Sequence, residues 1–149
     1  MKTITKIEAN RSAAIHRKCR VAAYCRGSTE HDDQMESLGT QKEHYAEWIK
    51  LHTEWESAGI FYDAGITGTK AEIRPGLQDL LQACRMGRVD RILVKSISRF
   101  SRNTAECLAL VRELSGIGVS VFFEKENIDT GSMESELFLT ILSSMAEEE

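Results

Sequence analysis

Four short apolar runs alternate along this chain with four segments of helical periodicity, and this alternation constrains the fold more than any other feature of the sequence. The runs are rich in β-branched and aromatic residues, as buried strands are. They are VAAYC (21–25), GIFYD (59–63), RILVK (91–95) and VSVFF (119–123). Because strands that alternate with helices pair in parallel, the order predicts an α/β fold with a mostly parallel central sheet and helices on both faces.

The helices are expected between and after these runs, at about residues 35–57, from Pro75 onward, at about 103–117 and from Met133 onward. The second begins with a proline, which suits the first position of a helix, where the missing N–H is not needed. The last carries a wide apolar stripe that continues to the end of the chain, formed by Leu137, Phe138, Ile141, Leu142 and Met145. Such a stripe either covers the sheet or meets a partner, and its unfinished pattern indicates a helix that continues.

The composition is typical of a soluble protein of about one domain. Of the 149 residues, 42% are hydrophobic and 28% are charged, with a single proline, which argues against long disorder. The sequence has neither the roughly 18 consecutive apolar residues of a membrane span nor a signal peptide, so a cytoplasmic protein is expected. Its four cysteines and four histidines lack the spacing of a disulfide framework or a metal site, and neither a metal nor a cofactor is expected.

The net charge of −4 hides a segregation of charge along the chain. Residues 1–20 and 85–102 are strongly basic, whereas the chain ends in three consecutive glutamates. A local basic surface of this kind fits a polyphosphate partner such as DNA, and it fits a mixed, solvated surface equally well.

Polar residues follow three of the expected strands at the point where each ends, and in a parallel sheet those points share one edge. The three segments are 26–29, 63–67 and 96–102. Guanidinium groups match two phosphate oxygens at once and stay charged at neutral pH. Four arginines in or beside these segments therefore predict a site for a phosphoryl group: Arg26, Arg74, Arg99 and Arg102.

Ser28 lies in the first of these segments, within AYCRGST (23–29). Beside several arginines, its hydroxyl would be a nucleophile whose transition state is stabilised by positive charge. The alternative is that Ser28 and Thr29 only bind a phosphate or cap the next helix. Asp63 would orient an arginine, hold the Ser28 loop or form a turn. The nucleotide-binding patterns GxxxxGK[ST] and GxGxxG do not occur at the expected places, which weakens a nucleotide-binding function.

Five sequence strings, taken in order, resemble the catalytic domain of the serine recombinase (resolvase/invertase) family, and in particular the large serine recombinases of phages and mobile elements. They are AYCRGST, SLGTQ, FYDAGITGTKAEIRPGLQDLL, GRVDRILVKSISRFSRNTAE and NIDTGSMESELFLTILSSMAEEE, and they span about residues 20–149. The resemblance implies that Ser28 attacks a DNA phosphodiester, giving a 5′-phosphoserine link and a free 3′-OH. It also implies that the four arginines bind the phosphate, with supporting residues at Tyr24, Gln41, Asp63 and Thr67.

The same resemblance implies a domain organisation and partners. It gives a basic N-terminal extension (1–19), a catalytic core (20–132) and the start of a long oligomerisation helix (133–149), with the family's DNA-binding region absent from these 149 residues. The implied partners are double-stranded DNA and further copies of the protein, as a dimer and as a tetramer on DNA. Gly27 stands where the family usually has a larger apolar residue, which is expected to loosen the junction before Ser28. The competing hypotheses are a non-covalent phosphate- or nucleotide-binding α/β module and a non-catalytic oligomerisation domain.

Overall fold

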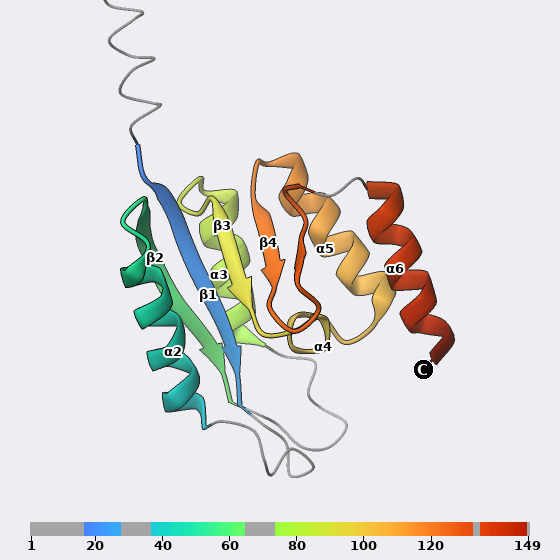
Figure 1. Ribbon diagram of the computed structural model, residues 1–149, viewed down its shortest axis with the longest axis horizontal. Coiled ribbons are helices and arrows are strands. Elements are labelled where there is room, and N and C mark those ends of the chain that lie inside the picture. The colour runs from blue at the N-terminus through green and yellow to red at the C-terminus, as the bar shows by residue number, and fades with distance from the viewer. Residues whose placement is uncertain (1–16, 28–36, 65–73, 133–134, 149) are drawn as a thin grey trace, which may run out of the picture.

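The structure, a computed structural model, describes residues 17–27, 37–64, 74–132 and 135–148. Within these residues it shows a five-stranded sheet in the order β2-β1-β3-β4-β5 (Figure 1). Four strands are mutually parallel: β1 (Cys19–Arg26), β2 (Trp55–Asp63), β3 (Arg91–Val94) and β4 (Ser120–Phe123). The short β5 (Ile128–Asp129) pairs antiparallel with β4 at the edge. The predicted α/β fold with a mostly parallel sheet is therefore confirmed.

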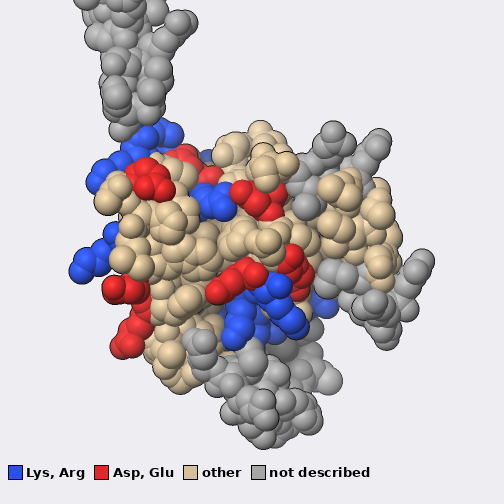
Figure 2. Space-filling view, viewed as in Figure 1, with Lys and Arg blue, Asp and Glu red and all other residues tan. Residues whose placement is uncertain are grey.

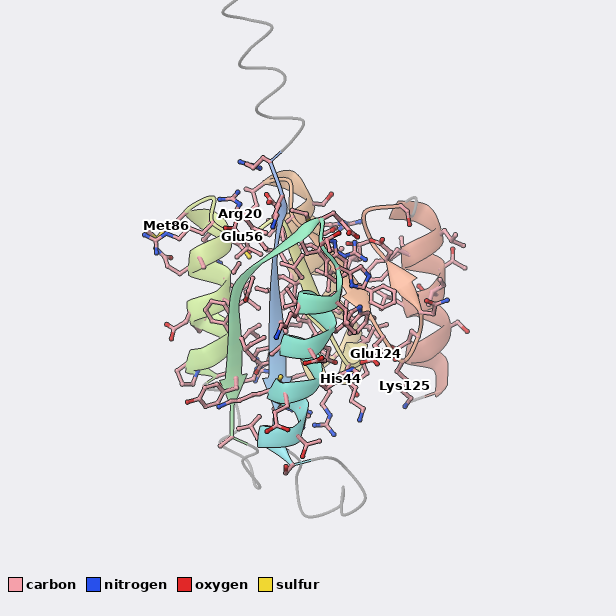
Figure 3. The ribbon with its side chains drawn as sticks, turned by 60° about the vertical axis from the view of Figure 1, so that its left-hand side comes forward. Arg20, His44, Glu56, Met86, Glu124 and Lys125 are labelled. Atoms are coloured by element: carbon pink, nitrogen blue, oxygen red, sulfur yellow. The ribbon has the colours of Figure 1, made fainter. Side chains whose placement is uncertain are left out.

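Helices cover both faces of the sheet. One face packs against α2 (Leu38–Leu51), and the other packs against α3 (Pro75–Arg85), α4 (Ile97–Phe100), α5 (Thr104–Gly116) and α6 (Ser135–Glu148). Figure 3 shows α2 and α3 on opposite sides of β1 and β2. Successive residues of β1 therefore enter different cores: Ala22 and Tyr24 face α3, whereas Val21, Ala23 and Cys25 face α2. A strand buried on both faces needs a continuous apolar run, which is what the sequence supplies.

Local signals in the sequence set most of the helix starts. Ser37 caps α2 by accepting from the Thr40 amide at 3.2 Å, and Asn103 caps α5 by accepting from the Glu106 amide at 2.8 Å. Pro75 stands at the start of α3, as predicted. The helices of the described residues include none that is long and apolar enough to cross a membrane.

The predicted boundaries were wrong in one place, and two elements were missed. The helix expected at 35–57 ends at Leu51, and β2 already begins at Trp55. The cause is pairing between distant segments, because Trp55 lies in register with Cys19 of β1. The order is also not a strict alternation, since α4 and β5 are additional elements. At the C-terminus α6 has 14 residues, so a long helix is not shown.

Candidate active site

The carboxyl ends of the parallel strands meet at one edge of the sheet, as the sequence predicted. Arg26 and Asp63, the last residues of β1 and β2, are paired in register, and the Gly27 amide donates to the Asp63 carbonyl at 2.9 Å. Ser96 follows β3, and its hydroxyl caps α4 by accepting from the amide of Arg99. On the side toward which these strands run, Figure 2 shows a group of Lys and Arg side chains flanked by Asp and Glu.

The backbone carbonyl of Arg26 is held by two side chains. The Arg99 guanidinium donates to it at 2.7 Å, and the Gln41 side-chain amide donates at 3.2 Å. Both side chains are buried, so the chain is fixed at the residue where β1 ends. Ser28, two residues further along, lies outside the described residues, and so does Thr67. The structure therefore describes what surrounds the start of the Ser28 segment.

Asp63 caps a helix that is distant in the sequence. Its carboxylate accepts from the Gly76 amide at 2.7 Å, the Leu77 amide at 3.0 Å and the Tyr24 hydroxyl at 2.6 Å. Arg74, at the N-cap position of α3, makes no side-chain cap bond of its own. The carboxylate of Asp63 thus satisfies helix N–H groups that would otherwise lack a partner. Capping α3 was not among the roles expected for Asp63. The hydrogen bonds of its carboxylate to described residues come from amides and a hydroxyl, not from an arginine, and the Ser28 loop lies outside the described residues.

The Tyr24 hydroxyl remains protonated at neutral pH. Burial and the hydrogen bond to Asp63 raise its pKa above the ordinary value, whereas the positive charges of Arg74 and Arg26 act in the opposite direction with smaller effect. Tyr24 is therefore a neutral hydrogen-bond donor whose oxygen lies within the field of two arginines. This arrangement suits a supporting residue that fixes Asp63.

Two arginines from different elements share one carboxylate. Arg74 donates through one Nη to Glu106 Oε1 at 2.6 Å and through the other to the Phe100 carbonyl at 3.0 Å. Arg102 donates to Glu106 twice, from its Nε to Oε2 and from its backbone amide to Oε1, each at 3.1 Å. The Arg74 side chain is 8% exposed and that of Arg102 is 43% exposed. Arg102 therefore lies nearer to solvent than Arg74.

Glu106 is a functional candidate that the sequence reasoning missed. Burial raises its pKa, but the hydrogen bonds from Arg102 and the charges of Arg74 and Arg102 outweigh this effect, so the pKa lies below its ordinary value. The carboxylate is ionised at neutral pH. A signal was present in the sequence, because Asn103 and Glu106 have the N-x-x-E spacing typical of a helix start. Nothing in that spacing indicates Arg74, which is 32 residues away.

The four predicted arginines are connected through short contacts. Arg99 contacts the Arg26 carbonyl, Arg74 contacts the carbonyl of the residue after Arg99, and Arg74 and Arg102 share Glu106. Guanidinium groups gathered at the end of a parallel sheet form a site for an anion with several oxygens. The contacts therefore link the side chains of Arg74, Arg99 and Arg102, and the backbone carbonyl of Arg26, as candidates for such a site.

A second polar cluster lies beside this edge, between α2 and the end of β4. The Glu124 carboxylate accepts from the Tyr45 hydroxyl at 3.0 Å and lies 3.3 Å from His44 Nε2. Figure 3 shows His44 and Glu124 next to each other. A cavity of about 160 Å³ is lined by these three residues together with Gln41 and Lys95. The cluster thus adjoins the Gln41 that holds the Arg26 carbonyl.

The four cysteines form no disulfide with one another, and three of them, Cys25, Cys84 and Cys107, are buried. Burial raises the pKa of Cys84 and Cys107 to about 11, so both thiols are protonated at neutral pH. Within the described ranges, no three His, Cys, Asp or Glu side chains lie close enough together to hold a metal ion.

The residues expected to oligomerise on α6 divide between the inside and the surface of the chain. Phe138 and Leu142 are buried, and Ile141 packs against the same core. Phe138 stacks on Phe123 of β4 with ring centroids 6.2 Å apart. Leu137 is 52% exposed. The side chain of the fifth residue, Met145, lies outside the described part. Much of the stripe therefore covers this domain's own core.

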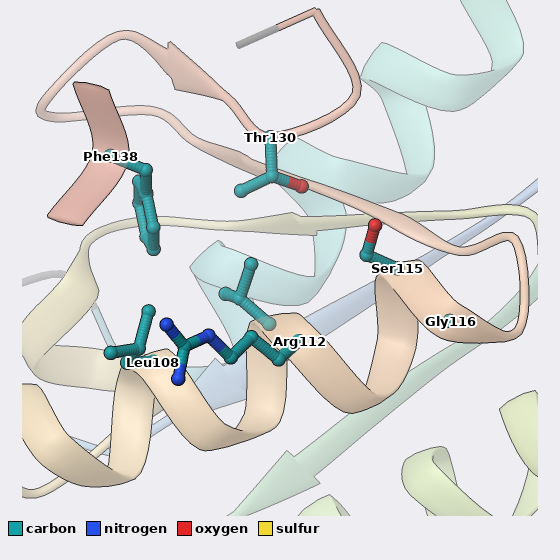
Figure 4. A pocket seen from close by; sticks show the side chains of 7 residues that line it. Leu108, Arg112, Ser115, Gly116, Thr130 and Phe138 are labelled. Atoms are coloured by element: carbon teal, nitrogen blue, oxygen red, sulfur yellow. The ribbon is translucent and has the colours of Figure 1, made fainter. Parts of the chain in front are cut away.

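A cavity of about 310 Å³ lies between α5 and α6 (Figure 4). Its lining includes Leu108 and Val111 of α5, Phe138 of α6 and Thr130 of the segment after β5, with the Arg112 side chain among them. Its lining is mainly apolar and includes none of the four predicted arginines.

Comparison with known protein families gives one match over most of the chain. The family described as "Resolvase, N terminal domain" matches residues 21–149. Among characterised proteins, the transposon Tn552 DNA-invertase BinR of Staphylococcus aureus is 38% identical over 90 residues, which are 59% of this chain and 45% of that protein. The chain spans less than half the length of this and other curated relatives that it matches.

Solved structures give a similar result with fuller coverage. The N-terminal catalytic domain of TP901-1 integrase is 32% identical, with a TM-score of 0.67, over 86% of this chain and 94% of that one. A resolvase family site-specific recombinase from Streptococcus pneumoniae is 29% identical, with a TM-score of 0.69, over 87% of each chain. The similarity thus covers most of this chain in both cases.

Proposed function

This chain belongs to the resolvase family of serine recombinases, as an N-terminal catalytic domain, and from that premise we propose that it cuts and rejoins DNA through a covalent bond to Ser28. The observation that carries the proposal is the set of contacts joining Arg26, Arg74, Arg99 and Arg102 at the sheet edge. The Ser28 segment begins two residues after Arg26, whose carbonyl is fixed by Arg99. A nucleophile delivered from this point enters a field of positive charge.

The reaction is a transesterification at phosphorus. The Ser28 oxygen forms a bond to the phosphorus of a DNA phosphodiester and loses its proton, while the bond to the 3′ oxygen breaks and that oxygen gains a proton. The products are a 5′-phosphoserine ester and a free 3′-OH. Rejoining is the same reaction in reverse with a 3′-OH of the second DNA end. Because one phosphate ester replaces another, the step needs no nucleotide to drive it.

The arginines stabilise the charge that develops on the phosphate oxygens during both steps. Guanidinium groups are suited to this task because they present two N–H groups to two oxygens and do not lose their proton at neutral pH. Tyr24, Gln41 and Asp63 act in support: Gln41 holds the end of β1, and Tyr24 and Asp63 fix the start of α3 next to Arg74.

The wider assembly is part of the same proposal. Double-stranded DNA is the substrate, and two or four copies of the protein bring two DNA sites together. Leu137 and Leu139 of α6 are exposed, and each offers apolar surface to a second copy. We further propose that α6 is the beginning of a long oligomerisation helix and that site recognition depends on a separate DNA-binding region.

The test is to find the covalent adduct and map it. The protein is incubated with fragmented double-stranded DNA and quenched with denaturant, and peptides that retain a nucleotide are sequenced by mass spectrometry. We expect a phosphoester at Ser28, none in Ser28→Ala, and a normal yield in the control Ser57→Ala, which changes an exposed serine of β2. An adduct that persists in Ser28→Ala would assign the nucleophile to another residue. DNA binding without any adduct in the parent protein would favour the non-covalent phosphate-binding module.

A further inference from the structure

One carboxylate, that of Glu106, joins two arginines that come from different parts of the chain. Arg74 stands at the start of α3, and Arg102 lies between α4 and α5. Glu106 Oε1 is 2.6 Å from the guanidinium of Arg74, and Oε2 is 3.1 Å from Nε of Arg102. Two guanidinium groups repel each other, so a negative charge between them is what allows them to stay close.

The position of Glu106 is itself fixed. Its amide donates to the Asn103 side chain at 2.8 Å in the first turn of α5, and its Oε1 also accepts from the Arg102 amide. Arg74 is held at its second Nη by the carbonyl of Phe100, a fully buried residue. With these contacts the two guanidinium groups have a defined separation and orientation before any phosphate arrives.

Another ion pair of the described residues, between Arg85 and Glu113, serves as a comparison because it lies on the surface. Arg85 and Glu113 are 2.7 Å apart, but their side chains are 46% and 43% exposed, and neither lies at the carboxyl edge of the sheet. Arg74 is buried, and a buried charge without a partner is costly. Within the described residues, the contacts of Arg74 engage two N–H groups of the five that a guanidinium carries, so binding Glu106 still leaves donors for a phosphate.

We propose that Glu106 is a positioning residue of the catalytic centre, whose carboxylate holds Arg74 and Arg102 in the arrangement that receives the scissile phosphate. This proposal rests on the proposed function. Glu106 does not touch the phosphate; it acts through the two arginines. The incoming phosphodiester accepts further hydrogen bonds from the same guanidinium groups, and the transition state gains from their fixed placement.

The test compares Glu106→Gln with Glu113→Gln, which makes the same change in the same helix at the exposed pair. The first readout is nuclear magnetic resonance of the arginine side-chain N–H groups without DNA. We expect Glu106→Gln to shift the signals of Arg74 and Arg102 and to leave that of Arg85 in place, and Glu113→Gln to do the opposite. Signals of Arg74 and Arg102 that do not move would overturn the proposal, whatever the protein does to DNA.

The second readout is the reaction with DNA, using a fragment recovered from the parent protein's own covalent adducts. We expect Glu106→Gln to slow adduct formation at saturating DNA at least tenfold while the dissociation constant changes less than threefold, and Glu113→Gln to match the parent. Equal rates for both variants would overturn the positioning role and leave the Ser28 chemistry intact, whereas failure of the proposed function would appear as no Ser28 adduct in the parent.

A third variant covers the case in which Glu106→Gln does not fold. Glu106→Asp keeps the charge, but its side chain is shorter by one CH₂ and cannot bridge both guanidinium groups at the observed distances. We expect Glu106→Asp to fold and to form the adduct at a rate between those of the parent and Glu106→Gln. If Glu106→Gln does not fold, the expectation is a rate below that of the parent. A rate equal to that of the parent would refute the need for a bridging carboxylate.

Discussion

Replacing Asp63 by asparagine tests how far one carboxylate organises the edge of the sheet. In the structure Asp63 accepts three hydrogen bonds, from the amides of Gly76 and Leu77 and from the hydroxyl of Tyr24. Asparagine has the same shape but one acceptor oxygen. If the amide keeps oxygen at the position that serves Leu77 and Tyr24, its NH₂ group faces the Gly76 amide, and two donors meet.

The cost follows from these contacts. A buried amide without an acceptor costs about 1–3 kcal/mol, and the lost negative charge at the start of α3 adds about 0.3–1 kcal/mol. We therefore expect Asp63→Asn to lower the free energy of unfolding by about 1–4 kcal/mol. For a chain of this length each kcal/mol corresponds to about 2–4 °C in Tm, so Tm should fall by roughly 2–16 °C.

The assay is thermal and urea unfolding followed by circular dichroism at pH 7. The control is Asp79→Asn, the same change at an exposed position of α3, the helix that Asp63 caps. We expect this control to stay within about 0.5 kcal/mol of the parent. A loss of stability in Asp63→Asn as small as that of the control would refute the capping role of Asp63.

Two further predictions concern α6 and the amino end of the sheet. Phe138→Ala should lower the free energy of unfolding by about 3–5 kcal/mol in urea unfolding, because Phe138 is buried, whereas the exposed Leu137→Ala should change it by about 0.5 kcal/mol or less; equal effects would show that α6 does not pack as described. At the amino end of the sheet, the hydrogen bond from Arg20 holds the pKa of Asp90 below its ordinary value. The resulting stability is present above the ordinary carboxyl pKa of about 4 and is lost as the pH falls through the lower folded-state value. Urea midpoints should therefore separate Asp90→Asn from the parent at pH 7 and converge toward pH 3, and a gap that stays constant would contradict the pairing.

The element types could be predicted because they depend on local patterns. The runs that became β1, β2, β3 and β4 are apolar on both faces, and the starts of α2, α3 and α5 carry recognisable capping residues or a proline. The two-residue β5 has no such signal, and it forms because the chain turns back onto β4. The end of α2 was misplaced because Trp55 continues the apolar pattern of the helix, yet pairs with Cys19 in the sheet.

The candidate site also has a part that the sequence predicts and a part that it does not. The four arginines could be found in the sequence because each lies near the end of an expected strand, and parallel strands deliver those ends to one edge. The partners of these arginines could not be found, because they belong to other elements. Two of the acceptors are backbone carbonyls, that of Arg26 for Arg99 and that of Phe100 for Arg74, and every residue type carries such a group.

The sequence by itself therefore determined the class of fold, and it indicated the sheet edge and the cationic residues of the candidate site, since periodicity and capping depend on local patterns. Only the tertiary structure decided which groups meet. Asp63 caps α3 across 13 residues, and Glu106, which also binds Arg102, reaches Arg74 across 32 residues. Such contacts depend on strand register and on how helices pack over the sheet, and these are set by the whole core rather than by any one segment.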